Sequence, residues 1–379
     1  MSSSPVVIAG AGIGGLTAAL TLHRRGIPAT VVDRAQRLQP LGVGINLLPH
    51  AVRELEALGL GAALKSISVA PQRISYFDSS GRHLFSEPRG LAGGYRYPQR
   101  SVHRGRLHDL LLTAVSERLG SDAVCTGAAL TGVTRRGSGV VAHTARGDLS
   151  ASVLVGADGI NSVVRTVVHP GPDPLMWSGI RMYRGAARTE PFLDGTTMAI
   201  VQGAGNSQLV AYPIGDGLVN WVLLVGAGEP GPLPGDARWN HPADPDEVAS
   251  HVEDWQLDWL DTEALPRCSD EVFEYPMVDR DPLPRWGDET VTLLGDAAHP
   301  MYPVGANGAS QAIVDARVLA DALAGDPRNG LRSYQARRRP ETAAVVAANR
   351  DMHRRTSPRP DDIARVTAQY RDITERSSS

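Results

Sequence analysis

The chain has almost no lysine and very little cysteine. Lys65 is the single lysine among 379 residues, and arginine supplies the rest of the 38 basic side chains. A catalytic Schiff-base lysine would therefore have one candidate, which we discount. Cys125 and Cys268 lie far apart in sequence and form no CxxC pair. This spacing excludes a disulfide framework, a dithiol redox centre and a cysteine-based zinc site.

Long apolar runs and a strong net charge are also missing. The N-terminal MSSSP has no basic region, and the first apolar run, Val6 to Ala9, ends at Gly10. No run approaches the roughly 18 residues of a membrane span. The net charge of -3 leaves no basic field for nucleic acid. We therefore expect a cytoplasmic protein, monomeric or homodimeric, that binds neither membranes nor nucleic acid.

The length and composition are those of an enzyme with more than one core. Apolar residues make up 42% of the chain and charged residues 21%, which is ordinary for a globular protein. A chain of 379 residues exceeds what one hydrophobic core usually supports. Neither a Ser/His/Asp arrangement nor a metal-ligand constellation is visible, so we expect no metal.

The N-terminus has the pattern of a βαβ dinucleotide-binding unit. Residues 6–9 predict a buried strand, residues 14–25 a helix and residues 29–33 a second buried strand. Gly10, Gly12 and Gly15 fit G-x-G-x-x-G in the connection, with Ile13 and Gly14 between them. Glycines let the backbone approach a pyrophosphate, and the helix start supplies free N–H groups. Asp33 follows Gly15 by 18 residues, where a carboxylate can accept from a ribose hydroxyl.

The middle of the chain changes from an alternating α/β pattern to a β-rich one. Residues 41–60 predict a glycine-rich loop and a helix, residues 101–119 a helix, and residues 153–156 a third buried strand. Residues 176–228 hold alternating β-type runs separated by turns, including Gly215-Asp216-Gly217. We expect a helix over 246–260, a strand over 291–294, a helix over 309–325 and helical structure from 331. The polar tail from about 356 is expected to fray.

These patterns predict an α/β fold. It comprises an FAD/NAD(P)-binding Rossmann-like domain, an inserted mixed β-sheet substrate domain and C-terminal helices. We assign residues 1–70, 101–175 and 286–330 to the binding domain. Residues 71–100 and 176–285 form the substrate domain, and residues 331–379 the helical segment.

The stretch LLGDAAHPMYPVGANGASQA, residues 293–312, predicts the second half of the cofactor site. Asp296 ends a buried strand, and ligands collect at the carboxyl ends of such strands. Its carboxylate can accept from a ribityl chain. Gly305 and Gly308 allow the backbone to touch a planar ring, and the following helix start favours the negative charge of a reduced flavin. A cofactor that uses both ends of the chain suits FAD better than NAD.

Several segments together resemble one enzyme family. GAGIGG, ADGINSVVR and LLGDAAHPMYPVGANGASQA are similar to the FAD-dependent aromatic hydroxylases with a para-hydroxybenzoate-hydroxylase-like fold, over nearly the whole chain. SVHRGRLHDLLL, AYPI, VNWV and YPMVDRDPLPRWG resemble the phenazine hydroxylase branch of these flavoprotein monooxygenases. The predicted function is therefore hydroxylation of a small aromatic or heteroaromatic compound, phenazine-like in this branch and part of secondary metabolism.

The resemblance implies roles for individual residues. Besides the N-terminal glycines it implies cofactor contacts for Asp33 or Arg34, Gly44, Arg104, Asp158, Gly159, Asp296, Pro303, Gly305, Asn307, Gly308 and Ala309. Two residues depart from the family pattern. Asp33 stands where the family usually has Glu, and His50 stands where Asn is frequent. His50 is a pocket candidate, but a structural histidine is the preferred interpretation.

In this class NADH or NADPH reduces FAD, and O2 then gives a flavin C4a-hydroperoxide that transfers oxygen to the ring. The cofactor performs the chemistry, while the protein excludes water and positions the ring. We expect pocket residues from the inserted sheet and the 303 loop: Arg184, Tyr212, Trp221, Met277 and Pro303. Arg184 could pair with a substrate carboxylate.

Alternatives remain open from the sequence. An NAD-dependent dehydrogenase would use the N-terminal unit but leaves residues 291–312 unexplained. The missing CxxC argues against a flavin disulfide reductase, and the missing W-x-W-x-x-P against a flavin halogenase. A non-catalytic protein that binds flavin or an aromatic ligand is a further alternative. Among oxygenases, epoxidation, decarboxylative hydroxylation and N-hydroxylation also remain.

Overall fold

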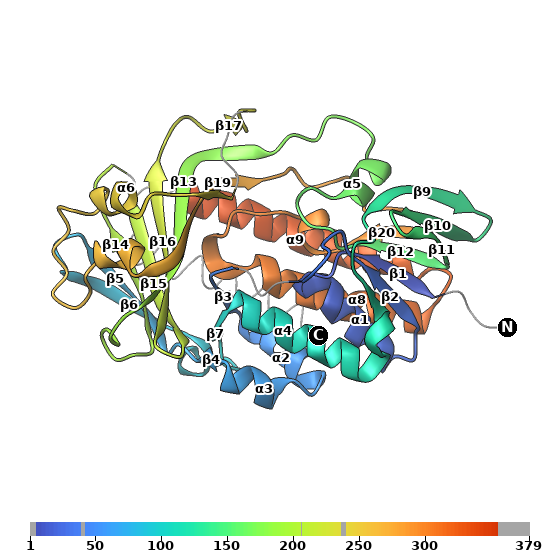
Figure 1. Cartoon of the computed structure of the whole chain (residues 1–379), viewed down its shortest axis with the longest axis horizontal. Coiled ribbons are helices and arrows are strands. Elements are labelled where there is room, and N and C mark those ends of the chain that lie inside the picture. Colours follow the sequence, from blue (N-terminus) through green and yellow to red (C-terminus); the bar gives the residue numbers. More distant parts are fainter. Residues whose placement is uncertain (1–4, 39–41, 206, 236–239, 355–379) are drawn as a thin grey trace.

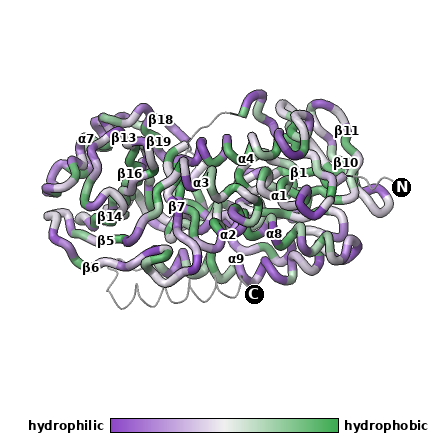
Figure 2. The backbone as a smooth tube through the Cα atoms, turned by 90° about the horizontal axis from the view of Figure 1, so that it is seen from below, coloured by the Kyte–Doolittle hydropathy of each residue, from purple (hydrophilic) through white to green (hydrophobic). Residues whose placement is uncertain are grey.

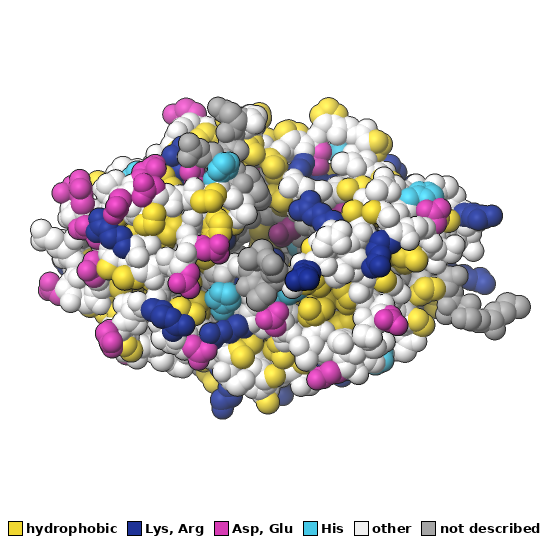
Figure 3. Space-filling model, in the orientation of Figure 1, with side chains coloured by type: hydrophobic (Ala, Val, Ile, Leu, Met, Phe, Trp, Pro, Cys, Tyr) yellow, Lys and Arg dark blue, Asp and Glu magenta, His cyan; other side chains and the backbone are white. Residues whose placement is uncertain are grey.

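The computed structural model describes residues 5–38, 42–205, 207–235 and 240–354. A parallel sheet with helices around it lies at one end of the molecule, and a large mixed sheet lies at the other (Figure 1). Apolar segments run through the interior of the first region, and hydrophilic segments are frequent along the outer turns (Figure 2). On the face seen in Figure 3, acidic and basic side chains lie interspersed. Within the described residues, no helix is both long and apolar enough to span a bilayer.

The parallel sheet contains the strands that the sequence predicted near residues 6, 29, 153 and 291. Its order is β20-β12-β1-β2-β8, and all its pairs are parallel. Every residue of β1 is buried, as expected for a strand covered on both faces. The strands are β1 (Val6–Ala9), β2 (Ala29–Val32), β8 (Val124–Cys125), β12 (Val153–Gly156) and β20 (Val291–Leu293).

Small residues allow the helices to approach this sheet closely. A Cβ on residue 15 would lie 1.9 Å from the carbonyl oxygen of Gly10, and a Cβ on residue 10 would lie 2.3 Å from that of Ala157. Only glycine fits at either position. The principal helices here are α1 (Ile13–Arg24), α4 (Arg104–Leu119) and α8 (Gly308–Gly325), and α1 packs against both others.

The mixed sheet has the order β18-β19-β13-β16-β15-β14-β5-β6, with β17 paired to β13. Its pairs are antiparallel except β14 with β5. The strands are β5 (Arg73–Asp78), β6 (His83–Pro88), β13 (Met176–Arg188), β14 (Thr197–Gln202), β15 (Gln208–Gly215), β16 (Leu218–Gly226), β17 (Gly231–Pro232), β18 (His241–Pro242) and β19 (Ser269–Asp279).

The two faces of the mixed sheet have different surroundings. One face carries Tyr183, Trp221 and Leu223, which form a core with Val248 and Leu265. These last two belong to α6 (Pro245–Ser250) and α7 (Ala264–Arg267). The other face looks toward the parallel sheet. The predicted hairpin at 215–217 is confirmed, since β15 ends and β16 begins there.

Two further sheets each contain three strands. β3 (Gly44–Leu47), β7 (Arg100–His103) and β4 (Ser68–Val69) form an antiparallel sheet in the order β3-β7-β4. Another antiparallel sheet contains β9 (Leu130–Arg136), β10 (Gly139–Thr144) and β11 (Gly147–Ala151). The remaining helices are α2 (Pro49–Ala57), α3 (Gly61–Ser66), α5 (Val163–Val168) and α9 (Gly330–Arg354).

Two local predictions were wrong. The predicted helix over 246–260 is limited to α6, because the backbone N–H of Gln256 donates to Ser79 O instead of continuing a helix. Residues 44–47, predicted as loop, form β3 and pair with β7. The tail from 356 lies outside the described residues. β5 and β6, from residues 71–100, lie in the same sheet as β13–β16, but the division into domains stays a prediction.

Candidate functional site

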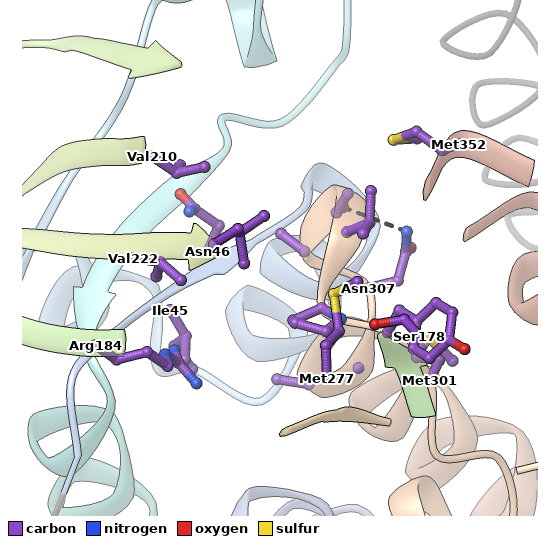
Figure 4. A pocket seen from close by; sticks show the side chains of 18 of the residues that line it. Ile45, Asn46, Ser178, Arg184, Val210, Val222, Met277, Met301, Asn307 and Met352 are labelled. Carbon is purple, nitrogen blue, oxygen red and sulfur yellow. Dashed lines mark hydrogen bonds between the residues drawn. The ribbon is translucent and has the colours of Figure 1, made fainter. Parts of the chain in front are cut away.

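A cavity of about 1110 Å³ lies between the glycine loop before α1 and the inner face of the mixed sheet. Gly12–Gly14 line it at one end, Asp296 and residues 303–309 line its middle, and β13–β16 supply its floor. In the view of Figure 4, Arg184, Val222 and Val210 lie on one side, and Met277, Met301 and Asn307 on the other. The two halves of the predicted site therefore open into one space.

The glycine loop is held from two sides by hydrogen bonds to Ala11. Its backbone N–H donates to Asp33 Oδ2 over 2.7 Å, and its carbonyl lies 2.8 Å from His108 Nε2. That nitrogen must carry the proton, because a carbonyl oxygen only accepts. His108 lies on α4 and was not singled out by the sequence. Its place in the helix predicted over residues 101–119 was the available signal.

The predicted residues of the loop divide into lining and supporting positions. Gly12, Ile13 and Gly14 line the cavity, and a Cβ at Gly12 would meet no atom within 4 Å. Asp33 supports the loop rather than lining the cavity, and Gly10, Gly15 and the exposed Arg34 do not line it either.

The carboxylate of Asp158 caps the start of α5, the helix that follows it in the chain. Its carboxylate accepts from the backbone N–H groups of Val163 (2.7 Å) and Val164 (3.2 Å) and from the Ser162 hydroxyl, at the start of α5. Burial raises the pKa of Asp158, and these hydrogen bonds oppose the shift. Gly159 lines the cavity, whereas Asp158 does not. The predicted pair is therefore split into a structural carboxylate and a lining glycine.

Asp296 projects into the cavity from the turn that follows β20. Its side chain is exposed there, and the surrounding protein removes enough water to raise its pKa by desolvation, against the charges of His299 and Arg104. Arg104 also lines the cavity. A carboxylate in this position can accept from a ligand hydroxyl, as predicted for a ribityl chain.

A buried carboxylate holds the turn that carries Asp296. Asp315 Oδ2 accepts from the backbone N–H of Gly295 (3.0 Å) and from His299 Nε2 (2.6 Å), and Oδ1 accepts from Arg338 Nε (2.6 Å). Burial would raise the pKa of Asp315, but the charges of His299 and Arg338 and their hydrogen bonds lower it to about 2. The sequence did not predict this cluster, because its members lie on different elements.

Residues 303–309 bring backbone to the cavity wall at the start of α8. Gly305 has φ +75°, a left-handed conformation that favours glycine. Pro303, Gly305, Asn307, Gly308 and Ala309 all line the cavity, as predicted. The free N–H groups at the start of this 18-residue helix make the position attractive to negative charge.

The arrangement fits FAD. The open space above Gly12 and the start of α1 can take a pyrophosphate, and Asp296 can take the ribityl hydroxyls. The backbone at 303–309 can take the flat ring. Asn307 Oδ1 is a buried acceptor with no partner in the described part of the chain. The contacts themselves remain predictions.

The floor of the cavity is flat and largely apolar. Arg184 of β13 is the cross-strand neighbour of Val222 in β16, and Val222 is the neighbour of Val210 in β15. The same row continues through Ile200 in β14 to Tyr76 in β5. Strands lie roughly 4.8 Å apart, so this row spans about 20 Å. Tyr212 and Met277 also line the cavity.

Arg184 is the conspicuous cation of this floor. Its Nη2 lies 3.4 Å from Gly44 O, and its Nε is buried with no partner among the described residues. Burial lowers the pKa of Arg184, and Tyr212 and Tyr275 oppose the shift. It forms no ion pair with a described carboxylate, so a bound anion could supply the missing partner.

Two predicted pocket residues lie elsewhere. Trp221 is 1% exposed on the opposite face of the sheet, where its Nε1 donates to Ser269 Oγ over 2.9 Å. His50 is buried in α2 outside the cavity lining, and neither of its nitrogens has a partner in the described chain. Burial, with the charges of Arg338 and Arg53, lowers the pKa of His50 to about 3. The structure therefore places neither residue at the cavity wall, and the structural interpretation of His50 agrees with this position.

Other lining residues were missed by the sequence. They come mainly from β3, β5, β6 and α9, which were predicted as loops or without detail: Ile45, Asn46, Tyr76, Glu87, Arg89, Gln99, Arg350 and Met352. Alternation along residues 44–47 was the one usable signal.

Sequence comparisons find relatives over the full length. A family model described as FAD binding domain matches residues 3–349. The phenazine 1,6-dicarboxylic acid hydroxylase PhzS of Lysobacter antibioticus is 45% identical over 401 residues, covering 99% of this chain and 98% of that protein. The 3-hydroxybenzoate 6-hydroxylase 1 of Aquipseudomonas alcaligenes is 35% identical, covering 91% and 87%.

Structure comparison gives the same architecture. HpxO of Klebsiella pneumoniae, solved with FAD and uric acid, matches with a TM-score of 0.80 at 24% identity, covering 98% of this chain and 93% of that one. At this identity the likeness shows the fold.

Proposed function

The chain belongs to the FAD-binding domain family, and on this premise we propose that it hydroxylates a planar aromatic carboxylic acid of the phenazine class. The reductant is NADH or NADPH. The observation that carries the proposal is Arg184, a half-buried cation without a carboxylate partner among the described residues, at one edge of a largely apolar floor.

The coarser predictions are confirmed. The chain is an FAD-dependent monooxygenase of the aromatic hydroxylase type, with a Rossmann-like parallel sheet, a mixed sheet and C-terminal helices. The dehydrogenase loses its support because the FAD-binding family match includes residues 291–312 as well as the N-terminal unit. The non-catalytic binding protein loses its support because the full-length relatives are hydroxylases.

The protein must bind and orient the reactants and exclude water from them. When bound, FAD supplies the redox chemistry with O2 and electrons from NADH or NADPH. The start of α8 would stabilise negative charge on the flavin ring, and Asp296 would accept from a hydroxyl of the ribityl chain. Val210, Val222 and Met277 exclude water from the reacting atoms.

A fused-ring acid suits this cavity better than a single ring. The row from β13 to β5 is longer than a benzoate, and its residues are mainly apolar. Arg184 would hold the carboxylate through charge-assisted hydrogen bonds and so place the ring on the floor. The full-length similarity to a phenazine dicarboxylate hydroxylase supports the same class.

The test is the anaerobic rate of flavin reduction by NADH and NADPH, with and without a panel of aromatic acids that includes phenazine-1-carboxylate. We expect that acid to accelerate reduction and, in air with ¹⁸O2, to yield a product that gains one labelled oxygen. Acceleration by a single-ring acid alone would contradict the proposal. The position of the label by NMR separates ring hydroxylation from epoxidation, decarboxylative hydroxylation and N-hydroxylation.

A further inference from the structure

We propose that Asn46 and Gln99 form a neutral hydrogen-bonding subsite that recognises a ring nitrogen of the substrate. It selects nitrogen-containing aromatic acids over carbocyclic acids of the same shape. The inference deepens the proposed function and rests on it for the carboxylate and the flat ring. Both residues line the cavity, and Figure 4 shows Asn46 beside the floor residues Val210 and Val222.

The orientation of the Asn46 amide follows from its neighbours. Ser101 Oγ lies 2.6 Å from Asn46 Oδ1, and Gln99 Nε2 lies 3.2 Å from the same oxygen. Gln99 Nε2 also lies 3.2 Å from Met198 Sδ, an acceptor. Two donors directed at one atom identify it as the amide oxygen. The NH2 group of Asn46 therefore points away from this cluster.

The remaining amide atoms meet the cavity. Asn46 is 6% exposed, Gln99 3% and Ser101 0%, so the cluster is almost fully buried. Neither Asn46 Nδ2 nor Gln99 Oε1 has a hydrogen-bond partner among the described residues, and neither atom is completely covered by protein. The residual exposure of both atoms is therefore toward the cavity. The subsite presents one neutral donor and one neutral acceptor to the cavity.

The subsite lies close to Arg184. The guanidinium of Arg184 is beside Gly44 O, and Asn46 follows Gly44 by two residues in β3. Residues two apart in a strand lie roughly 7 Å apart, and both Arg184 and Asn46 line the cavity. One fused-ring acid can therefore place its carboxylate at Arg184 and a ring atom at Asn46.

A ring nitrogen is the group that this donor fits. Its lone pair lies in the ring plane and accepts from an amide N–H, whereas a carbocycle presents a C–H at the same place. A buried amide donor left unpaired costs binding affinity, so the carbocycle should bind roughly tenfold or more weakly. Gln99 Oε1 would accept from a donor next to that nitrogen.

The experiment titrates the FAD-loaded enzyme with matched pairs of acids and follows the change in flavin absorbance. The first pair is phenazine-1-carboxylate and anthracene-1-carboxylate, and the second is quinoline-4-carboxylate and naphthalene-1-carboxylate. We expect the nitrogen-containing member to bind at least tenfold more tightly in the wild type.

Asn46→Asp is the informative variant. It keeps an oxygen for Ser101 and Gln99 but replaces the donor by an acceptor, so the buried cluster stays paired. Its charge repels both acids of a pair alike, and the ratio of the two affinities is therefore the readout. We expect that ratio to fall to about one at pH 8 and to recover in acid, where the new carboxyl group becomes protonated and donates again. Gln208→Leu removes another lining amide and should leave the ratio unchanged.

Equal binding of both members of both pairs by the wild type would overturn the inference. So would an unchanged ratio in Asn46→Asp, or an equal loss of the ratio in Gln208→Leu. Selective binding without any hydroxylated product would leave the subsite standing and remove the proposed function. Hydroxylation of both acids of a pair, bound with equal affinity, would support the proposed function and remove the subsite.

Discussion

The backbone N–H of Ala11 donates a 2.7 Å hydrogen bond to Asp33 Oδ2, joining the glycine loop to the end of β2. The other oxygen of Asp33 accepts from the N–H of Ala35 at 2.8 Å. The shorter acid at this position therefore holds the glycine loop that is predicted to contact the pyrophosphate. Glu is usual there in the family that the sequence resembles.

Asp33→Asn should weaken FAD binding by roughly tenfold, because an amide has one acceptor oxygen and can satisfy only one of the two N–H groups. Quenching of flavin fluorescence during titration of the apoprotein measures the affinity. Replacement of the nearby exposed Arg37 by Gln is the control and should change the FAD affinity little. Equal effects of the two changes on FAD affinity would contradict the role of Asp33 in holding the glycine loop.

Gly12→Ala and Gly15→Ala should differ in thermal stability, although both weaken FAD binding. A Cβ at residue 12 meets no atom within 4 Å, so the apoprotein should keep its thermal stability and lose FAD affinity by at least tenfold. A Cβ at residue 15 would lie 1.9 Å from Gly10 O, so that variant should lose stability as well. Thermal unfolding and FAD titration of both apoproteins separate the effects. Normal FAD affinity in Gly12→Ala would place the pyrophosphate elsewhere.

Asp296→Asn should stabilise the apoprotein at pH 8 while it weakens FAD binding. Desolvation raises the pKa of Asp296 in the folded state, so the ionised carboxylate costs stability above that pKa. As pH falls through the folded pKa, Asp296 becomes neutral and the advantage of Asn disappears. Urea unfolding at a series of pH values measures this difference. A stability difference between the variant and the wild type that does not change with pH would contradict the desolvation of Asp296.

Local patterns predicted the elements better than the site. Buried strands and the glycine loop are encoded by neighbouring residues, so β1, α1, β2, β12 and α8 followed from the sequence. Alternation in residues 219–225 correctly placed Trp221 and Leu223 on one face of β16. It could not say which face opens to the cavity. That depends on α6 and α7, which cover the Trp221 face from a later part of the chain.

Non-local contacts also explain the missed polar residues. Asn46, Gln99 and Met198 come from three distant segments and meet only after β3, β7 and the mixed sheet assemble. Asp315 and Arg338 lie on α8 and α9, and neither helix pattern indicates a charge pair in the core. Burial of such groups is decided by tertiary packing, which no sequence window contains.

Asp315→Ala should destabilise the protein by about 3 kcal/mol, because the buried Arg338 keeps only Glu341 as an ionic partner and the Gly295 N–H and His299 Nε2 lose their acceptor. In the wild type this carboxylate, with its pKa lowered to about 2, contributes stability above its ordinary pKa of about 4. That contribution should be lost as pH falls from about 4 toward 2. Urea unfolding measures both effects. Glu289→Ala, which removes an exposed pair with Arg332, should cost less than about 1 kcal/mol.

Arg184→Gln should raise the Kd of an aromatic carboxylate by roughly a hundredfold, since the variant loses a charge-assisted pair in a dry site. The matching primary carboxamide, which carries no charge, should lose much less. Flavin absorbance changes in the FAD-loaded enzyme measure both affinities. Gln202→Leu, a change elsewhere on the lining, is the control and should preserve the preference for the acid. If Arg184→Gln weakens acid and amide alike, Arg184 shapes the floor instead of pairing with the carboxylate. The substrate's charge must then be held by another cation that lines the cavity, such as Arg89, Arg104 or Arg350.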